Sequence, residues 1–316
     1  MTTITLFTLP LASQTLSPYW YWIILGVLAL GGIVLPIIDR INKKRKYESN
    51  IEWCRDIPLD CNLDEAYAIL NQLHEGSCKD DNRLSAYILK LIQMEALGIE
   101  PHPNKDGQTV PAFVVKTWKS ANEDGTDDQK LMHQIFNIFE QAAGDDKVIE
   151  PKELKTFMEN EWDNTVVLTF VNALHKGHYI DLSEHKDDIR QLLGLKKFLK
   201  EFTLVKERGM QEATLWKDYM VWATLFGCAP TVVQEMQKIN PEYFKMDGLA
   251  RQMLDSITTP DMHKSFVKAS NTAYSKLQSY HDDEERGIHR SSGSGGHASL
   301  GGGSGHSGGG SGGGIR

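Results

Sequence analysis

Outside its glycine-rich end, the sequence lacks the short motifs that organise the commonest enzyme sites. Residues 1–285 contain no Gly-x-Ser-x-Gly, no P-loop, no Gly-x-Gly-x-x-Gly and no His-Glu-x-x-His. No nucleophile elbow, phosphate cradle or zinc-binding helix is therefore predicted. We expect no enzyme activity, no catalytic residues, no cofactor and no small-molecule substrate, with a cryptic enzyme as the weaker alternative.

Cysteine is scarce and has no metal-type spacing. The four residues are Cys54, Cys61, Cys78 and Cys228. They form no Cys-x-x-Cys pair, and we expect free thiols in a reducing compartment. The stretch "AAGDDKVIEPKE" is similar to a calcium-binding loop, but Ala142 and Gly144 occupy the places of two ligands. We predict no bound metal.

Charge is missing altogether from residues 19–38, "YWYWIILGVLALGGIVLPII". Twenty residues at the rise of a helix are about long enough to cross a hydrocarbon core of about 30 Å. We therefore predict a single N-terminal transmembrane helix, with the lipid bilayer as a partner. A cleaved signal peptide is disfavoured, because no basic segment precedes the run and no small-residue cleavage pattern follows Ile38.

Lysine and arginine are absent before the predicted span and abundant after it. Residues 1–18 contain neither, whereas residues 39–50 form a basic juxtamembrane linker. The positive-inside rule then places the N-terminus outside and the bulk of the chain in the cytoplasm, on the inner or plasma membrane. Tyrosine and tryptophan at the outer end suit the headgroup layer. The predicted anchor residues are Tyr19, Trp20, Trp22, Arg40, Lys43, Lys44, Arg45 and Lys46.

Helical periodicity begins after the linker. Apolar residues recur at helical spacing over residues 63–73 and 84–97, and Asn62 is a plausible cap for the first of these helices. Two extended runs, 99–102 and 110–118, then flank an Asp-Gly turn. Helix, helix and β-hairpin in this order are similar to a winged helix.

The remaining cytoplasmic chain is expected to be mostly helical. Residues 51–189 form the winged-helix-like α+β region, which continues with a helix at 127–142 and a brief strand at Val148 and Ile149. Residues 190–285 are predicted to form a second helical subdomain.

Residues 286–316 are a Gly/Ser-rich tail. Because glycine and serine bury too little apolar surface to offset the entropy of ordering, we predict a disordered segment. The fold class that follows for the whole chain is mainly α with a small β component, α+β.

The charge of the chain argues against nucleic acid as a partner. The net charge is −8, and residues 51–120 hold seven basic and eleven acidic side chains, a balance of −4. Phosphate contacts dominate DNA affinity, and the candidate recognition helix offers only Arg83, Lys90 and Gln93. A membrane-tethered DNA-binding regulator therefore stays the second hypothesis, behind a protein-interaction module.

The apolar run after Asp218 is too short to be a second span. About fifteen residues precede Gln234, and Pro230 interrupts them. We predict buried helices that break at Gly227. The aromatic stripe of this segment is read as core packing or, alternatively, as a peptide-binding groove. Its residues are Trp216, Tyr219, Trp222 and Phe226.

Residues 194–244 resemble the C-terminal cytoplasmic segment of the YciQ-like predicted membrane proteins, a family defined by domain of unknown function 2207. The matching residues are Gly194, Leu199, Phe202, Leu215, Trp216, Tyr219, Ala223, Phe226, Gly227 and Val233. The resemblance extends over roughly residues 18–245 and the tail. It implies a membrane protein, and it marks Trp216, Tyr219, Trp222, Phe226 and Gly227 as family-box residues with a possible interaction role.

The sequence departs from that family at its N-terminal side. The family resemblance implies a sizeable extracytoplasmic domain before the first span and often a further pair of spans. Here eighteen residues precede the predicted span, and residues 159–193 contain no long apolar run. The function predicted is a membrane-anchored interaction or scaffold protein with other membrane proteins as partners.

Overall fold

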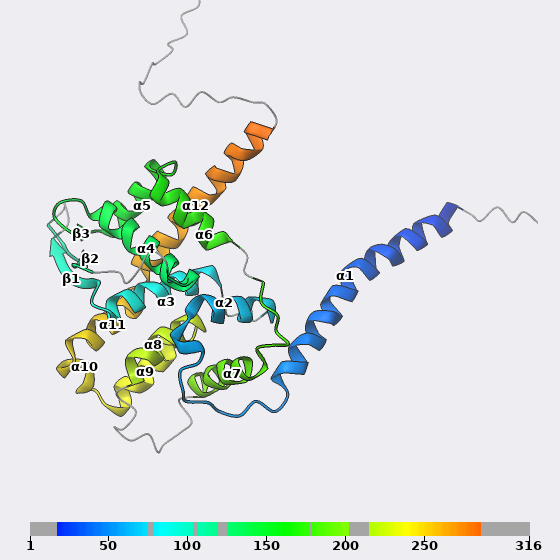
Figure 1. Cartoon of the computed structure of the whole chain (residues 1–316), viewed down its shortest axis with the longest axis horizontal. Helices are drawn as coiled ribbons and strands as arrows, with labels where there is room; N and C mark the ends of the chain where they lie inside the picture. Colours follow the sequence, from blue (N-terminus) through cyan, green and yellow to red (C-terminus); the bar gives the residue numbers. More distant parts are fainter. Residues whose placement is uncertain are drawn as a thin grey trace, which may run out of the picture. The chain divides into compact units, whose positions relative to one another are not determined.

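A computed structural model describes residues 18–74, 79–103, 107–118, 125–176, 179–201 and 215–285 (Figure 1). The expected N-terminal segment, except Pro18, and the Gly/Ser tail lie outside these ranges. Most described residues are helical, and three short strands form one sheet, which confirms the α+β class. The chain divides into two units, Met1–Leu277 and Gln278–Arg316. The second unit is described only over Gln278 to Glu285, which continue the last helix.

The first helix, α1 (Pro18–Glu48), is 31 residues long and contains both the predicted span and most of the basic linker. Its described apolar side chains are exposed, Leu28 and Val27 among them. Within the described ranges, no helix combines the length and apolar character that crossing a bilayer requires. The transmembrane helix therefore stays a prediction.

The two helices expected after the linker are present. A 3-10 turn, Leu59–Cys61, leads into α2 (Leu63–Gln72), and Asn62 caps this helix by accepting a 3.0 Å hydrogen bond from the Glu65 backbone. The next helix, α3 (Asp80–Gln93), has eight buried residues and a single fully exposed one, Asp81. The spacing of apolar residues thus located both helices.

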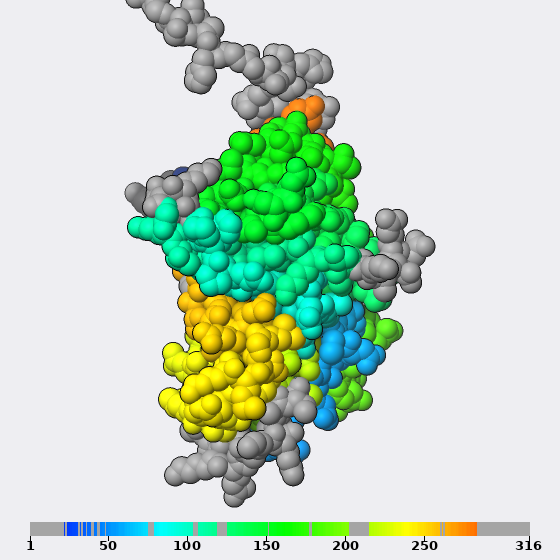
Figure 2. Space-filling view, turned by 90° about the vertical axis from the view of Figure 1, so that its left-hand side faces the viewer, coloured from blue at the N-terminus to red at the C-terminus, as the bar shows by residue number. Residues whose placement is uncertain are grey.

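The sheet is antiparallel, in the order β1 (Leu97–Pro103), β2 (Thr109–Val115), β3 (Val148–Ile149). The hairpin β1–β2 and the brief third strand agree with the expected runs, although Asn104, Lys105 and Asp106 of the turn lie outside the described residues. In the register of the sheet, Phe113 faces Ile149. The hairpin lies beside the later helix α11 (Gly248–Thr258), where the Ile99 amide donates to Gln252 Oε1 over 3.4 Å (Figure 2).

One helix precedes the third strand in the sequence, and two helices follow it. They are α4 (Asp127–Ala143), α5 (Pro151–Asn160) and α6 (Thr165–His175). A capping box between Thr126 and Gln129 starts α4, and Asn164 caps α6. These local hydrogen bonds satisfy amide groups that have no partner within the helix, which fixes where each helix begins.

Within its described residues, the C-terminal part contains helices and no strand. Its elements are α7 (Lys186–Lys200), α8 (Trp216–Leu225), α9 (Ala229–Ile239), α10 (Tyr243–Met246), α11 and α12 (Pro260–Glu285). Gly227 separates α8 from α9 with a φ of 71°, a conformation that glycine adopts without steric cost. The predicted break at Gly227 is confirmed.

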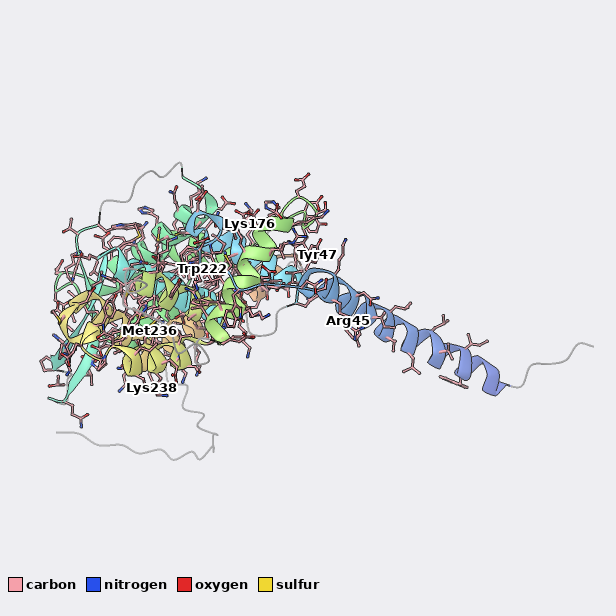
Figure 3. The ribbon with its side chains drawn as sticks, turned by 90° about the horizontal axis from the view of Figure 1, so that it is seen from below. Arg45, Tyr47, Lys176, Trp222, Met236 and Lys238 are labelled. Carbon is pink, nitrogen blue, oxygen red and sulfur yellow. The ribbon has the colours of Figure 1, made fainter. Side chains whose placement is uncertain are left out.

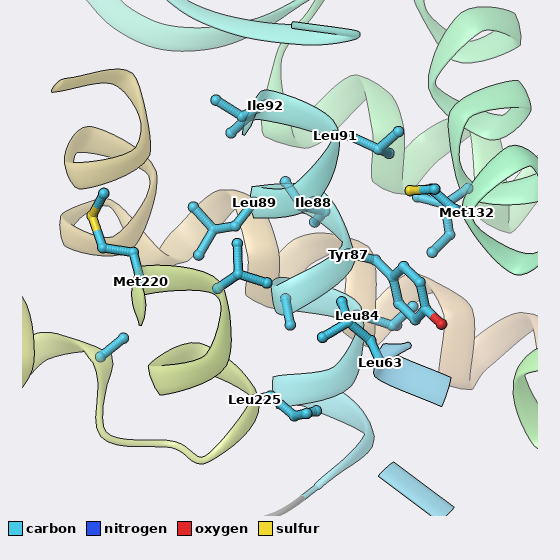
Figure 4. Close-up of a cluster of buried hydrophobic side chains, with 14 of the residues drawn as sticks. Leu63, Leu84, Tyr87, Ile88, Leu89, Leu91, Ile92, Met132, Met220 and Leu225 are labelled. Atoms are coloured by element: carbon cyan, nitrogen blue, oxygen red, sulfur yellow. The ribbon is translucent and has the colours of Figure 1, made fainter. Parts of the chain in front are cut away.

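One hydrophobic core joins residues from both regions that the sequence had suggested, 51–189 and 190–285. Helix α3 runs through its centre, with Leu84, Ile88 and Leu91 among the side chains that pack against the surrounding helices (Figure 4). The rings of Phe170 and Phe266 stack at 5.5 Å between the two regions. The core therefore crosses residue 190 without interruption.

Candidate functional site

The end of α1 and the residues after it are tied by several contacts to α7 and to residues just before and after it. The Tyr47 hydroxyl donates to the Leu182 carbonyl over 3.3 Å, and Lys197 Nζ donates to the Ile51 carbonyl over 3.0 Å. Trp53 Nε1 donates to Glu201 Oε2 over 2.6 Å. Figure 3 labels Tyr47 at the C-terminal end of α1. The end of α1 and the segment that follows it are thus attached to the body.

Gly194 makes this attachment possible. A Cβ at this position would lie 2.7 Å from the Glu52 carbonyl oxygen and 2.8 Å from Cys54 Cβ. Real side chains do not approach backbone so closely, so the segment that follows α1 crosses α7 only because residue 194 has no side chain. Gly194 is also one of the residues on which the family resemblance depends.

The predicted anchor residues all belong to α1 or its basic end. Trp22 is 71% exposed, and Arg45 and Lys46 are exposed as well. The side chains of the other five lie outside the described residues, although their backbone is helical; these five are Tyr19, Trp20, Arg40, Lys43 and Lys44.

The aromatic family-box residues are buried in the core. Trp216, Tyr219, Trp222 and Phe226 are each 2% exposed or less. Their rings pack against other aromatic rings: Trp216 meets Tyr243 edge to face at 4.9 Å and Phe244 stacked at 6.2 Å. Such buried pairs contribute roughly 0.5–1.5 kcal/mol beyond their burial. This geometry fits the core-packing alternative, and of the five box residues only Gly227 is exposed.

Tyr219 also connects the core to the segment after α1. Its ring packs against Phe198 of α7 at 5.6 Å, and its hydroxyl donates to the Arg55 carbonyl over 3.0 Å. The Arg55 guanidinium lies 5.5 Å from the centre of the same Phe198 ring. Helices α7 and α8 therefore hold the segment that begins where α1 ends.

A buried carboxylate organises the start of α2. Asp128 Oδ1 accepts hydrogen bonds from the Leu63 amide at 2.9 Å, the Asp64 amide at 3.2 Å and the Tyr87 hydroxyl at 2.7 Å. Burial and the Asp128 charge raise the pKa of Tyr87 well above its ordinary value, so this tyrosine stays protonated. The sequence pointed only to a helix start at Asp127 and Asp128, and nothing local identifies the distant amides that Asp128 binds.

The side chains that a DNA-reading helix would need are occupied inside the body. Arg83 is buried, pairs with Asp64 and donates to the Leu174 carbonyl over 2.9 Å. Lys90 donates to the Cys61 carbonyl over 2.6 Å, and Gln93 donates to Asp218 Oδ1 over 2.7 Å. Because α3 has one exposed position among its described side chains, it has no free face for a groove of DNA.

A mostly apolar pocket of about 290 Å³ lies between α3, the α8–α9 junction, α11 and α12. Ser256 and His263 line it, with Ser256 Oγ 2.6 Å from His263 Nε2. Burial lowers the pKa of His263 to about 4, so the imidazole is neutral near pH 7. Among the described residues, His263 Nδ1 finds no hydrogen-bond partner. Sequence reasoning missed this pocket because four separate segments form it.

A second polar cluster joins the first turns of α2 and α7. His185 Nδ1 lies 3.3 Å from Glu65 Oε1 and 3.1 Å from Asp188 Oδ2, a grouping that could hold a metal ion. Both carboxylates stand at helix starts, where the helix dipole favours negative charge and opposes a cation. The grouping is also explained by the contacts of the His185 ring with these two carboxylates at the start of α7.

The calcium-loop resemblance has a local explanation. Asp146 Oδ1 accepts a 3.0 Å hydrogen bond from the Val148 amide, and Glu153 accepts one of 3.1 Å from the Glu150 amide as part of a capping box. The oxygens that suggested a metal loop therefore serve the turn before β3 and the start of α5. The three described cysteines, Cys54, Cys61 and Cys228, are free thiols, as predicted.

Residues 165–236 match the family model described as "Predicted membrane protein (DUF2207) C-terminal domain". The match runs from the first residue of α6 into α9 and includes α7, α8, Gly194 and all five family-box residues. The predicted family resemblance is confirmed. No curated protein matches the chain. No solved structure matches it either.

Proposed function

We propose that this protein is a single-pass membrane anchor joined to an interaction scaffold, with its N-terminus outside and its body in the cytoplasm. The family model describes a predicted membrane protein of unknown function, which agrees with a membrane location. The observation that carries the proposal is α1, a 31-residue helix whose described apolar side chains are exposed.

Lipid is the environment that suits the exposed side chains of α1. Leu28, Leu30 and Leu35 are each more than 60% exposed in the chain by itself. Each Å² of apolar surface removed from water contributes about 25 cal/mol, so a bilayer around the uncharged residues 19–38 supplies a large favourable term. The basic residues that follow favour the cytoplasmic side.

The contacts between the end of α1 and α7 support a scaffold role. Tyr47, Ile51 and Trp53 bind α7 or the residues just before and after it, and Gly194 gives their segment room to pass. These contacts fasten the segment that follows the predicted anchor to the body, which a flexible linker would not do. Such an attachment is useful to a protein that presents a surface to neighbours in the same membrane.

Two exposed side chains of the body are candidates for that surface. Tyr179 is 87% exposed and Met246 is 85% exposed. Aromatic residues and methionine are enriched at protein interfaces. Nucleic acid is not favoured as a partner, because Arg83, Lys90 and Gln93 are engaged within the body. A DNA-binding regulator therefore receives no support from α3.

Carbonate extraction of membranes tests the anchor. The full chain should stay in the membrane pellet at high pH, and so should a variant with Leu28→Ala and Leu30→Ala. A variant with Leu28→Lys and Leu30→Lys should move to the soluble fraction, because each lysine at a span centre costs roughly 2.5–3.5 kcal/mol. Release of the unaltered chain by carbonate would contradict the anchor.

Crosslinking in intact membranes tests the scaffold. The full chain should form discrete crosslinked products with membrane proteins, and replacing Tyr179 and Met246 by serine should reduce them. Replacement of Lys238 and Arg190 by alanine serves as a control with exposed surface residues of another kind. A failure to obtain any crosslinked companion would count against the scaffold but would leave the anchor untouched.

A further inference from the structure

The pocket between α3, the α8–α9 junction, α11 and α12 has the composition of a small-molecule site. Its apolar walls come from four elements and include Leu89, Ala229, Ile257 and Val267. Its volume of about 290 Å³ equals the liquid volume of about ten water molecules. Apolar walls hold water poorly, so a molecule with apolar surface of its own is the better occupant.

The polar groups of the pocket are few and are placed together. Ser256 and His263 form one buried pair, and Ser85 lines the same space from α3. The pair is more than nine-tenths buried, and His263 Nδ1 has no partner among the described residues. A pocket with largely apolar walls and a few converging polar groups is typical of sites that orient a ligand by one hydrogen-bonding group.

The charges of the lining decide the charge of the occupant. Asp81 contributes a carboxylate and Lys264 an ammonium group, and both are exposed. His263, the remaining titratable lining residue, is neutral near pH 7 because burial lowers its pKa. Because one lining charge is negative and the other positive, they offset each other, and neither an anionic nor a cationic ligand finds a net opposite charge in the pocket. An uncharged ligand avoids both costs.

Two helix starts at the pocket favour an oxygen atom on the ligand. Residues 81, 82 and 85 of α3 line it, as do residues 229 and 230 of α9. In the described chain, neither helix has a side-chain cap, since Lys79 and Cys228 make no such hydrogen bond. The first amides of a helix carry partial positive charge. The Asn82 amide already donates to the Lys79 carbonyl over 2.9 Å and Pro230 has no N–H, so among the lining residues at these two helix starts the amides of Asp81 and Ala229 are the ones that face no such restriction. A hydroxyl or carbonyl oxygen suits them without bringing a full charge.

We propose that this pocket binds an uncharged, largely apolar molecule with one hydroxyl or carbonyl group and about ten to fifteen non-hydrogen atoms. The inference is independent of the membrane anchor and of the scaffold role, because every lining residue belongs to the body. It assigns the protein a ligand class that its family description does not mention.

Photolabelling with three probes of one shape tests the proposal. The probes are 4-(trifluoromethyl-diazirinyl)benzyl alcohol and the corresponding benzoate and benzylammonium, applied to the full chain in lipid nanodiscs. The alcohol should label peptides that contain residues 224–230 and 256–267, and excess 2-phenylethanol should suppress this labelling. The two charged probes should label these peptides about tenfold less, a difference that matches a tenfold change in affinity.

Two isoleucines provide matched variants. Ile257 lines the pocket, whereas Ile239 is 40% exposed at the far end of α9. Ile257→Trp should fill the space and reduce pocket labelling by about tenfold, and Ile239→Trp should leave it unchanged. If the circular dichroism spectrum shows that Ile257→Trp has lost its helical structure, Ser85→Phe is used as the pocket-filling variant instead. Equal labelling by all three probes, labelling confined to α1, or full labelling of the pocket-filling variant would each overturn the proposal.

Discussion

The chain contains two aromatic and apolar helices that have opposite surroundings. Helix α1 carries exposed apolar side chains along its described length, whereas α8 buries seven of its ten residues. The difference follows from length and interruption. Residues 19–38 form an uninterrupted uncharged run. The apolar run that begins in α8 is interrupted after that helix, at Gly227 and again at Pro230. The short apolar helix completes the core, whereas the long uncharged run is the segment for which we predict a bilayer.

Two tryptophans give the sharpest form of this comparison. Trp222 of α8 is 1% exposed, and Trp22 of α1 is 71% exposed. We expect Trp222→Ala to lower the free energy of unfolding of the body by roughly 3–5 kcal/mol, because it leaves a large cavity. Trp22→Ala should leave that free energy unchanged. Urea denaturation of both variants, followed by circular dichroism in nanodiscs, measures the difference, and similar losses in the two would break the comparison.

Acid should destabilise the body through His263. Its pKa is about 4 in the folded state and 6.5 by ordinary expectation, so the unfolded chain binds more protons between these values. The stabilisation is complete above about pH 6.5 and is lost as the pH falls to 4, by about 3 kcal/mol in all. Denaturation midpoints of the unaltered chain and of His263→Gln across this range test it. An equal slope in the variant would show that other groups are responsible.

Two helical glycines compare the attachment with the helix that it holds. A Cβ at Gly194 meets the Glu52 carbonyl, whereas a Cβ at Gly26 in α1 meets nothing within 4 Å. Gly194→Ala should cost roughly 1–3 kcal/mol, since the clash exceeds the usual gain from alanine in a helix. Gly26→Ala should be neutral or favourable by up to about 1 kcal/mol. Thermal unfolding distinguishes them, and a stabilised Gly194→Ala would mean that the segment after α1 does not cross α7 closely.

The smallest expected effect concerns a helix cap. Asn62 caps α2 beside the buried Asp128, which binds the next two amides of the same helix. Asn62→Ala should therefore cost only about 1 kcal/mol, the usual value for a cap. Asn164→Ala at α6 removes a cap that accepts from the Val166 amide over 2.9 Å, and it should cost about as much or slightly more. Denaturation of the two variants in parallel gives the ranking.

The spacing of apolar residues within each segment predicted most of the helices and strands, but it did not predict the contacts between residues far apart in the sequence. The spacing of apolar residues predicted α2 and α3, the short strand at Val148 and Ile149, and the break at Gly227. The sequence placed Asp128 in the helix expected at 127–142, but the amides that it binds lie 65 and 64 residues away. The Ser256–His263 pocket needs four segments to come together. The periodicity of one segment does not indicate which distant segments it contacts.

The winged-helix comparison shows the same limit. Helix, helix and hairpin do follow one another, but the burial of α3 on nearly every side depends on α8 and α11, which come more than one hundred residues later. The predicted recognition helix offered three candidates for DNA contact, Arg83, Lys90 and Gln93. Their actual partners, including Leu174 and Asp218, are distant in the chain and were invisible to it.

A paired topology reporter tests the central claim most directly. Two reporters are fused in turn behind Ile288 of the full chain. Alkaline phosphatase is active only outside the cytoplasm, whereas green fluorescent protein fluoresces in the cytoplasm and not after export in unfolded form. We predict bright fluorescence and no phosphatase activity, with both proteins retained in the membrane fraction. Phosphatase activity without fluorescence would place the body outside and contradict the anchor orientation on which the scaffold rests.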